Sequence, residues 1–241
     1  MTNGVLEQSV IDLAPGGLVT RATNQAEEVL FVVSGQGELR LNDKRYALGP
    51  ETGVNLAPGQ DYELHNDGSD PMRTVSVRIG GPAPRTNATP APPRAAADAA
   101  PAPRDGAPRE RIPVRRLADQ EAHNATTDRS FRIVADPSTG LESATHFVGY
   151  VPPARAPDHF HTYDEVIYVL DGQGAFHAGG TSRPIGAGSC IELPARTVHC
   201  LENTGQDVMR LVAVFVPAGS PAAAYYPDGT PAYPGTPALT I

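Results

Sequence analysis

The residues best suited to chemistry lie in the last third of the chain. His159 and His161 are separated by one residue, and Glu165 follows four positions after the pair. His199 comes 34 residues after Glu165. In an extended strand, alternate residues point to one face about 6.6 Å apart, so the paired histidines can converge on one point. Three imidazoles and a carboxylate suit a divalent ion of Fe, Mn, Ni, Cu or Zn, and we expect one such ion.

The elements that must position these side chains are short runs of branched and aromatic residues. Examples are residues 29–33 and 74–79 in the first part of the chain, and 166–170 and 211–216 in the last part. Turns rich in Gly, Pro, Asn and Asp separate such runs, and no long segment has a helical period. This pattern predicts an all-β protein built as a sandwich or barrel.

The beginning of the chain repeats in its last part at a distance of 137 residues. Glu28 falls on Glu165, residues 35–37 fall on 172–174, and Asn66 falls on Asn203, all without a gap. Such a match indicates an internal duplication and predicts two lobes with one fold.

Residues 81–111 separate the two repeats. This segment is dominated by proline, alanine and arginine and contains no Val, Ile, Leu, Met or aromatic residue. It lacks the apolar surface that would offset the entropy of ordering it. We therefore predict a disordered Pro/Ala-rich linker at 81–111 between a domain at 1–80 and a domain at 112–241.

The second repeat resembles the cupin superfamily in two motifs. The matching residues are His159, His161, Glu165 and Gly172 in the first motif, and Gly188, Pro194, His199 and Asn203 in the second. Arg196 stands in the turn where the motif usually has glycine. The resemblance implies two cupin-type β-barrels, that is, jelly rolls or double-stranded β-helices. It also implies that His159, His161, Glu165 and His199 bind the metal.

The first repeat has lost most of this constellation. The 137-residue shift places Ala22, Asn24 and Tyr62 where the second repeat has its three histidines, and only Glu28 is kept. A carboxylate, an amide and a phenol are poor ligands for a transition metal. We therefore expect a metal in the C-terminal lobe alone.

Three further residues are candidates for catalysis. His177 could move a proton in the pocket, or could be a hydrogen-bonded histidine of the barrel. Arg155 could clamp a substrate carboxylate, or lie solvated at the rim. Tyr163 could cap the pocket mouth, or pack outside it.

The resemblance favours a metal-dependent enzyme acting on a small oxygenated molecule, with a dioxygenase as the leading hypothesis. One alternative is a non-oxidative isomerase, decarboxylase or lyase that uses the metal as a Lewis acid. The other is a non-catalytic cupin that binds a small ligand or a metal. Four protein ligands on a six-coordinate ion leave about two positions for substrate, water or dioxygen.

The composition limits the partners. The 241 residues carry a net charge of −8, which gives no electrostatic reason to bind nucleic acid or an anionic membrane. The sequence contains no apolar run of transmembrane length and no secretory signal, so we expect a cytoplasmic protein. Cys190 and Cys200 imply no disulfide framework. A monomer and a homodimer are equally consistent with two fused lobes.

Overall fold

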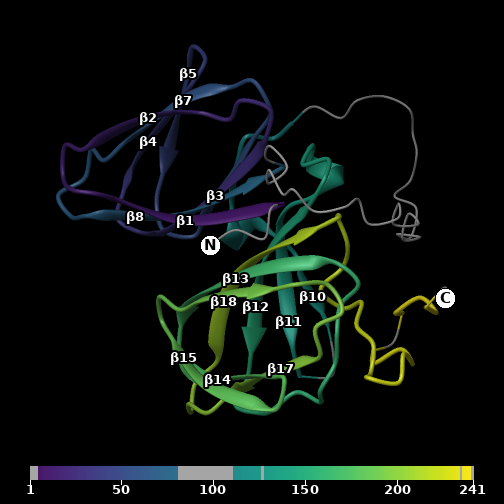
Figure 1. Ribbon diagram of the computed structural model, residues 1–241. Helices are drawn as coiled ribbons and strands as arrows, with labels where there is room; N and C mark the ends of the chain where they lie inside the picture. The colour runs from purple at the N-terminus through teal and green to yellow at the C-terminus, as the bar shows by residue number, and fades with distance from the viewer. Residues whose placement is uncertain (1–4, 81–110, 126–127, 234, 240–241) are drawn as a thin grey trace, which may run out of the picture.

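The computed structural model describes residues 5–80, 111–125, 128–233 and 235–239. These residues form two β lobes, which Figure 1 shows one above the other, the first purple to blue and the second teal to yellow. The predicted linker, residues 81–111, lies outside the described residues except for Arg111. The all-β prediction is confirmed, because strands and two short 3-10 helices are the only regular elements described.

The first lobe consists of two sheets. A five-stranded sheet has the order β1-β8-β3-β6-β9, and a four-stranded sheet has the order β2-β7-β4-β5. The strands are β1 (Leu6–Leu13), β2 (Leu18–Ala22), β3 (Glu27–Ser34), β4 (Gly37–Leu41), β5 (Lys44–Leu48), β6 (Thr52–Leu56), β7 (Asp61–His65), β8 (Met72–Ile79) and β9 (Val114–Arg116).

The second lobe also consists of two sheets, a six-stranded one of order β10-β11-β12-β18-β13-β16 and a three-stranded one of order β15-β14-β17. The strands are β10 (Ala122–Asn124), β11 (Ser130–Ala135), β12 (Thr145–Val151), β13 (Asp164–Asp171), β14 (Gln173–Ala178), β15 (Thr181–Gly186), β16 (Cys190–Leu193), β17 (His199–Asn203) and β18 (Met209–Val216). The 3-10 helices are η1 (Leu117–Asp119) and η2 (Pro137–Thr139). Each lobe is a jelly roll whose two sheets are not joined into one closed ladder.

The strand register repeats between the lobes. Glu28 on β3 pairs with Arg78 on β8, and Glu165 on β13 pairs with Phe215 on β18. Both members of the second pair lie 137 residues after those of the first, so the duplication seen in the sequence is present in the sheets.

Strand β9 connects the two halves of the chain. It follows the predicted linker in sequence, yet it pairs with β6 at the edge of the first lobe's five-stranded sheet. The chain then continues through η1 to β10 and β11 of the second lobe. The second half of the chain therefore contributes a strand to the first lobe.

Three hydrophobic cores hold the molecule together. One lies inside the first lobe and includes Leu30, Leu56 and Tyr62, and one lies inside the second lobe and includes Ile167 and Phe215. The third lies between the lobes, where β3 and β8 pack against β13 and β18. These central strands are buried on both faces, which explains their nearly continuous apolar runs.

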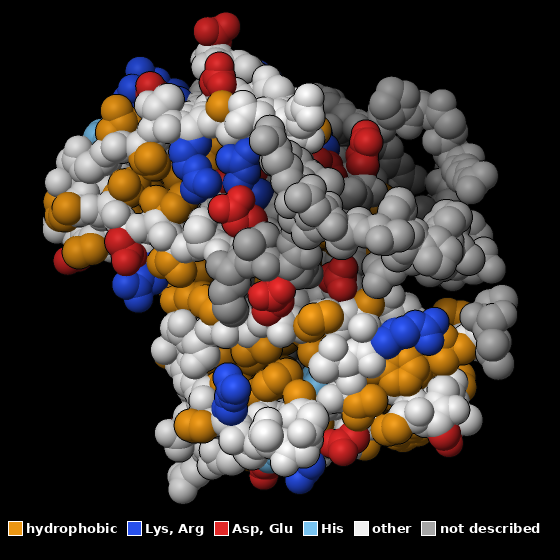
Figure 2. Space-filling view, viewed as in Figure 1, with side chains coloured by type: hydrophobic (Ala, Val, Ile, Leu, Met, Phe, Trp, Pro, Cys, Tyr) orange, Lys and Arg blue, Asp and Glu red, His pale blue; other side chains and the backbone are white. Residues whose placement is uncertain are grey.

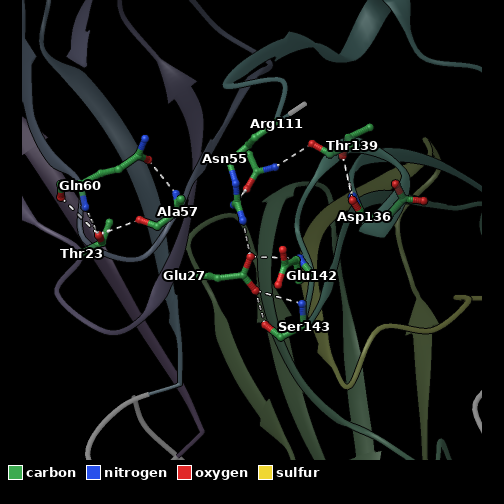
Figure 3. A network of polar contacts seen from close by, with 10 residues as sticks. All are labelled: Thr23, Glu27, Asn55, Ala57, Gln60, Arg111, Asp136, Thr139, Glu142 and Ser143. Carbon is green, nitrogen blue, oxygen red and sulfur yellow. Dashed lines mark hydrogen bonds and ion pairs between the residues drawn. The ribbon is translucent and has the colours of Figure 1, made fainter. Parts of the chain in front are cut away.

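A polar network locks the interface between the lobes (Figure 3). The Glu27 carboxylate of the first lobe pairs with Arg111 at 2.6 Å and accepts hydrogen bonds from Glu142 and Ser143 of the second lobe. Burial alone would raise the pKa of Glu27, but the bonds from Ser143 and Arg111 outweigh it and lower that pKa. Arg111, the last residue of the predicted linker, is thus fixed in the interface.

No helix in the described part of the chain is long and apolar enough to cross a membrane. On the face shown in Figure 2, acidic and basic side chains are interspersed over both lobes and form no single basic surface.

Candidate metal centre

The structure brings the three predicted histidines together. His159 and His161 lie in the segment between β12 and β13, and His199 begins β17. His159 and His199 exchange two backbone hydrogen bonds of 3.0 and 2.8 Å, which place their side chains next to each other. One ring nitrogen from each histidine lies within 4.8 Å of the other two. All three side chains are buried, so the group could hold a metal ion by its arrangement as well as by its spacing.

Backbone carbonyls orient the three rings. Each Nδ1 lies 2.8 to 2.9 Å from a carbonyl oxygen, and because a carbonyl only accepts, each Nδ1 carries the proton. The partners are Pro157 for His159, Ala223 for His161 and Thr197 for His199. This leaves Nε2 of each ring unprotonated, which is the form that binds a metal ion.

The turn before His199 keeps its shape despite the departure from the cupin motif. Arg196 adopts a φ of +63°, the left-handed conformation for which glycine is favoured. Its backbone N–H donates to the carbonyl of His161 at 2.7 Å. The substitution of the usual glycine therefore costs backbone strain and leaves the geometry of the ligands intact.

The electrostatics of the site favour neutral imidazoles. Burial lowers the pKa of His161 to about 4, with a smaller contribution from His159, and it also lowers the pKa of His159 and His199. The histidines are thus ready to bind a cation at neutral pH without first releasing a proton.

Glu165, the fourth predicted ligand, lies on β13 in the wall of the same cavity. It is buried, and this burial raises the pKa of its carboxyl to about 8 in the metal-free protein. Among the described residues, the group of converging ligand atoms contains the three histidines and not Glu165. Three neutral imidazoles with a carboxyl group in the same wall nevertheless fit a divalent transition metal, because these are the donors that such ions take.

The site opens into a cavity of about 90 Å³. One water needs roughly 10–15 Å³, so the cavity holds several waters or a ligand of a few heavy atoms. Its walls are mostly apolar, with Phe131, Phe147 and Leu211 among them, and Arg129 and Tyr233 supply polar groups. A ligand at the histidines would therefore contact mostly apolar side chains.

The structure places the three predicted catalytic residues outside the cavity lining. The Tyr163 ring lies behind His161, stacked at 5.7 Å, and its hydroxyl donates to the carbonyl of Ser220. It supports a metal ligand and does not cap the mouth.

His177 and Arg155 lie on the outer side of the three-stranded sheet. His177 pairs with Cys200 in the ladder, and cross-strand partners share a face, so it points away from the side of His199. Its Nε2 lies 2.8 Å from Glu202. Arg155 is half exposed and donates to the Cys200 thiol and to Asp158. Neither residue is placed to contact a ligand in the cavity.

Sequence reasoning missed Arg129 and Tyr233. Arg129 precedes β11, far from both motifs, and one of its N–H groups donates to the carbonyl of Leu201 at 3.1 Å. Tyr233 lies near the C-terminus, and its ring centre is 5.9 Å from that of His159. No spacing rule connects either residue to the histidines, because only the folding of the chain brings them to the cavity.

The first lobe has a polar cluster at the equivalent place. Glu28 is fully buried, and one of its oxygens accepts hydrogen bonds from Tyr62 at 2.9 Å and Ser76 at 2.7 Å. Arg21 lies 3.5 Å from the same oxygen. Asn24, at the position of His161, has a φ of +53°. Side chains of the protein itself thus bind one oxygen of this carboxyl, and the other, Oε2, is buried without a hydrogen-bond partner among the described residues.

Comparison with known proteins explains the duplicated architecture. The sequence profile of the cupin domain matches twice, at residues 9–78 and 146–215, which is more than half of the chain. The chain belongs to the cupin family. Because both halves match, the protein is a bicupin, and the expected fold is confirmed.

Solved structures show the same bicupin fold at low sequence identity. A glyoxylate-induced protein from Pseudomonas aeruginosa is 21% identical with a TM-score of 0.68, and the match covers 88% of this chain and 75% of that one. AerE from Microcystis aeruginosa is 14% identical with a TM-score of 0.63, covering 88% and 86%. A Bacillus subtilis oxalate decarboxylase variant is 15% identical with a TM-score of 0.66, covering 90% and 71%. No match is found among curated proteins.

Proposed function

We propose that this bicupin is a divalent-metal-dependent enzyme whose C-terminal lobe acts on a small oxygenated organic anion, with dioxygen as co-substrate. The observation that carries the proposal is the convergence of three buried histidines, each with Nε2 free, at the wall of a mostly apolar cavity. The first lobe lacks such a group at the equivalent place, where Glu28 is enclosed by Arg21, Tyr62 and Ser76.

The chain's own residues would divide the work as follows. His159, His161 and His199 hold the metal, and Glu165 in the same wall completes the donor set. When bound, a divalent metal supplies Lewis-acid or redox chemistry at its open positions. The apolar walls exclude water, which strengthens electrostatic contacts with a bound ligand.

Arg129 would recognise the negative charge of the substrate. Arg129 lines the cavity, and its N–H bond to the Leu201 carbonyl fixes the side chain there. A carboxylate is the anionic group that best fits its planar fork. This supports a small carboxylic acid as the substrate class.

Non-oxidative chemistry is the second candidate. The fold is shared with a protein named oxalate decarboxylase, and Arg129 suits a carboxylate in that reaction equally well. In this case the metal would act as a Lewis acid, and the enzyme would need no dioxygen. The two candidate reactions share the substrate class, and only the first of them consumes dioxygen.

The test starts from the metal-free protein, loaded in turn with Fe(II), Mn(II), Ni(II), Cu(II) and Zn(II) and supplied with a panel of small carboxylic acids. Dioxygen uptake and product formation are recorded, with a His161→Ala variant as the control that keeps the cavity and removes one ligand. Metal-dependent dioxygen uptake supports the proposal. Equal turnover under strict anaerobiosis shows the non-oxidative reaction, and no turnover with any metal contradicts both.

A further inference from the structure

A segment beyond the matched cupin domain forms part of the site. Residues 218–233, which we call the strap, follow β18 and are the yellow chain beside the second lobe in Figure 1. The strap contributes Pro221 and Tyr233 to the cavity wall and the Ala223 carbonyl to His161.

The strap is fixed at its beginning and in its middle. Near its start, Thr145 of β12 exchanges two hydrogen bonds with the backbone of Gly219, at 2.9 and 3.1 Å. A side chain at Gly219 would collide with the Tyr163 ring, since a Cβ there would lie 2.6 Å from it. In its middle, Tyr225 forms a β-bridge with Phe160, the residue between the two metal-ligand histidines.

A turn then returns the strap to the cavity. The N–H of Tyr226 donates to Thr230 at 2.8 Å, and the N–H of Ala232 donates to Ala224 at 2.8 Å. This hairpin places Tyr233 back beside the histidines, while Tyr226 at its turn stays exposed. Tyr233 is thus held by backbone pairing and not only by its own contacts.

Tyr233 and Arg129 belong to one electrostatic group at the cavity. Burial raises the pKa of the Tyr233 hydroxyl, and the nearby Arg129 acts in the opposite direction. The two side chains come from opposite ends of the second lobe's sequence and meet at the cavity wall. Arg129 and Tyr233 line this cavity from segments outside the strands, whereas the polar side chains of Ser130 and Tyr150 line it from β11 and β12.

We propose that Tyr233 is the specificity-determining residue of this site, because the strap holds its ring in the cavity wall beside His159, where it limits the size of the ligands that reach the histidines. The ligand class, a small carboxylate, rests on the proposed function. The shielding of the histidines by the Tyr233 ring does not rest on the proposed function. An experiment can therefore contradict the shielding without contradicting the proposed function, and the reverse.

The first experiment uses the metal-free protein and needs no turnover. Diethyl pyrocarbonate modifies unprotonated imidazoles, and peptide mapping by mass spectrometry gives a rate for each histidine. In a Tyr233→Ala variant we expect His159 and His199 to react severalfold faster than in the wild type, relative to the exposed His123. A Tyr233→Phe variant should keep the wild-type rates, because the ring provides the shielding.

Tyr226→Ala is the matched control, since it removes a tyrosine from the same hairpin that does not line the cavity. It should leave the relative rates of His159 and His199 unchanged. Equal rates in Tyr233→Ala and wild type would overturn the proposal. So would an equal increase in Tyr226→Ala, because that would show a general loosening of the strap.

The second experiment measures selectivity in the cobalt-loaded protein. Dissociation constants for formate, acetate and benzoate follow from changes in the cobalt absorption spectrum. Tyr233→Ala should improve benzoate binding relative to formate by about tenfold or more, a usual size for discrimination by pocket shape. An unchanged benzoate-to-formate ratio would contradict the assignment. If cobalt does not bind at all, the proposed function fails, and the modification rates alone decide the role of Tyr233.

Discussion

The two lobes carry a glutamate at the same place in the same strand, but its surroundings differ. In the first lobe, Glu28 on β3 meets the hydroxyls of Tyr62 and Ser76 and the guanidinium of Arg21. In the second lobe, Glu165 on β13 lies in a cavity wall with three histidines and mostly apolar side chains. Thus one oxygen of the first carboxyl is bound by side chains of the chain itself, while its Oε2 is buried without a hydrogen bond in the described part of the chain, and the second carboxyl lines a cavity that can take a ligand.

The comparison shows that a jelly roll can satisfy a buried carboxyl in two ways. Leaving a buried charged or polar group without partners is costly, so each lobe must supply a cation or a proton. The first lobe supplies Arg21, and the metal-free second lobe keeps Glu165 protonated, as its pKa of about 8 indicates. In our proposal, a metal ion takes the place of that proton when it binds.

The largest expected effect comes from removing one metal ligand. His161→Ala should reduce the bound metal from one ion per chain to nearly none, because it removes one of the three converging nitrogens. Losing an outer-shell partner already costs about 10–100-fold in metal affinity, so losing a ligand should cost more. Metal content is measured by elemental analysis, and circular dichroism checks that the barrel remains folded.

Tyr62→Phe provides the control from the first lobe, since Tyr62 holds the place of His199. It should leave the metal content unchanged. A wild-type stoichiometry near two ions per chain would contradict the difference between the lobes, as would a His161→Ala variant that keeps its metal.

The sequence predicts the histidine cluster well because local geometry fixes it. His159 and His161 alternate along one extended segment, and His199 follows a turn whose motif spacing is kept. The duplication, the all-β fold and the replacement of the three site histidines by Ala22, Asn24 and Tyr62 in the first lobe follow from the same kind of pattern. These features depend on residues that lie close together in sequence, or on a repeat that sequence displays directly.

The rest of the site depends on contacts that sequence spacing does not encode. Arg129 and Tyr233 reach the cavity from segments outside both motifs. His177 illustrates the reverse case, because its face depends on the β14–β17 register, which pairs it with Cys200 and turns it outward. Sequence spacing does not predict the pairing of β9 with β6 of the first lobe either, because the two strands lie on opposite sides of the predicted linker.

The next effect in size concerns the stability of the two buried carboxyls. Glu28→Ala should lower the free energy of unfolding by about 3 kcal/mol, because it leaves Arg21, Tyr62 and Ser76 without their shared acceptor. Glu165→Gln in metal-free protein should not destabilise the fold, because the carboxyl it replaces is buried and protonated at neutral pH. Urea denaturation at pH 7 measures both variants.

The pH dependence sharpens this contrast. The folded protein keeps a proton on Glu165 that the unfolded chain releases above its ordinary pKa of 4.5, so stability from this group falls as pH rises from 4.5 to about 8. Glu165→Gln should therefore gain stability relative to the wild type over that window. A Glu165→Gln variant that is as destabilised as Glu28→Ala would show that the two carboxyls have equivalent surroundings.

The smallest of the three effects lies at the interface between the lobes. His146 on β12 pairs with Val214, and Gln8 on β1 pairs with Val77, so the two residues hold equivalent places. His146 is buried, its Nδ1 has no partner, and burial lowers its pKa to about 3. In the unfolded chain, His146 takes up a proton below pH 6.5, whereas in the folded protein it stays neutral down to about pH 3. The free energy of unfolding therefore falls as pH drops from 6.5 towards 3.

His146→Gln copies the residue of the first lobe and removes this titration. Between pH 6.5 and 5 the wild type should lose about 1.4 kcal/mol more per pH unit than the variant, or about 2 kcal/mol in all, as urea denaturation at pH 7.5 and 5 would measure. The metal-ligand histidines titrate in both proteins, so the difference reports His146 alone. His123→Gln, at an exposed position, is the matched control for the loss of one imidazole. If His146→Gln loses stability in acid as steeply as the wild type, then His146 becomes protonated in the folded protein. That result would contradict the expectation that the interface keeps His146 neutral.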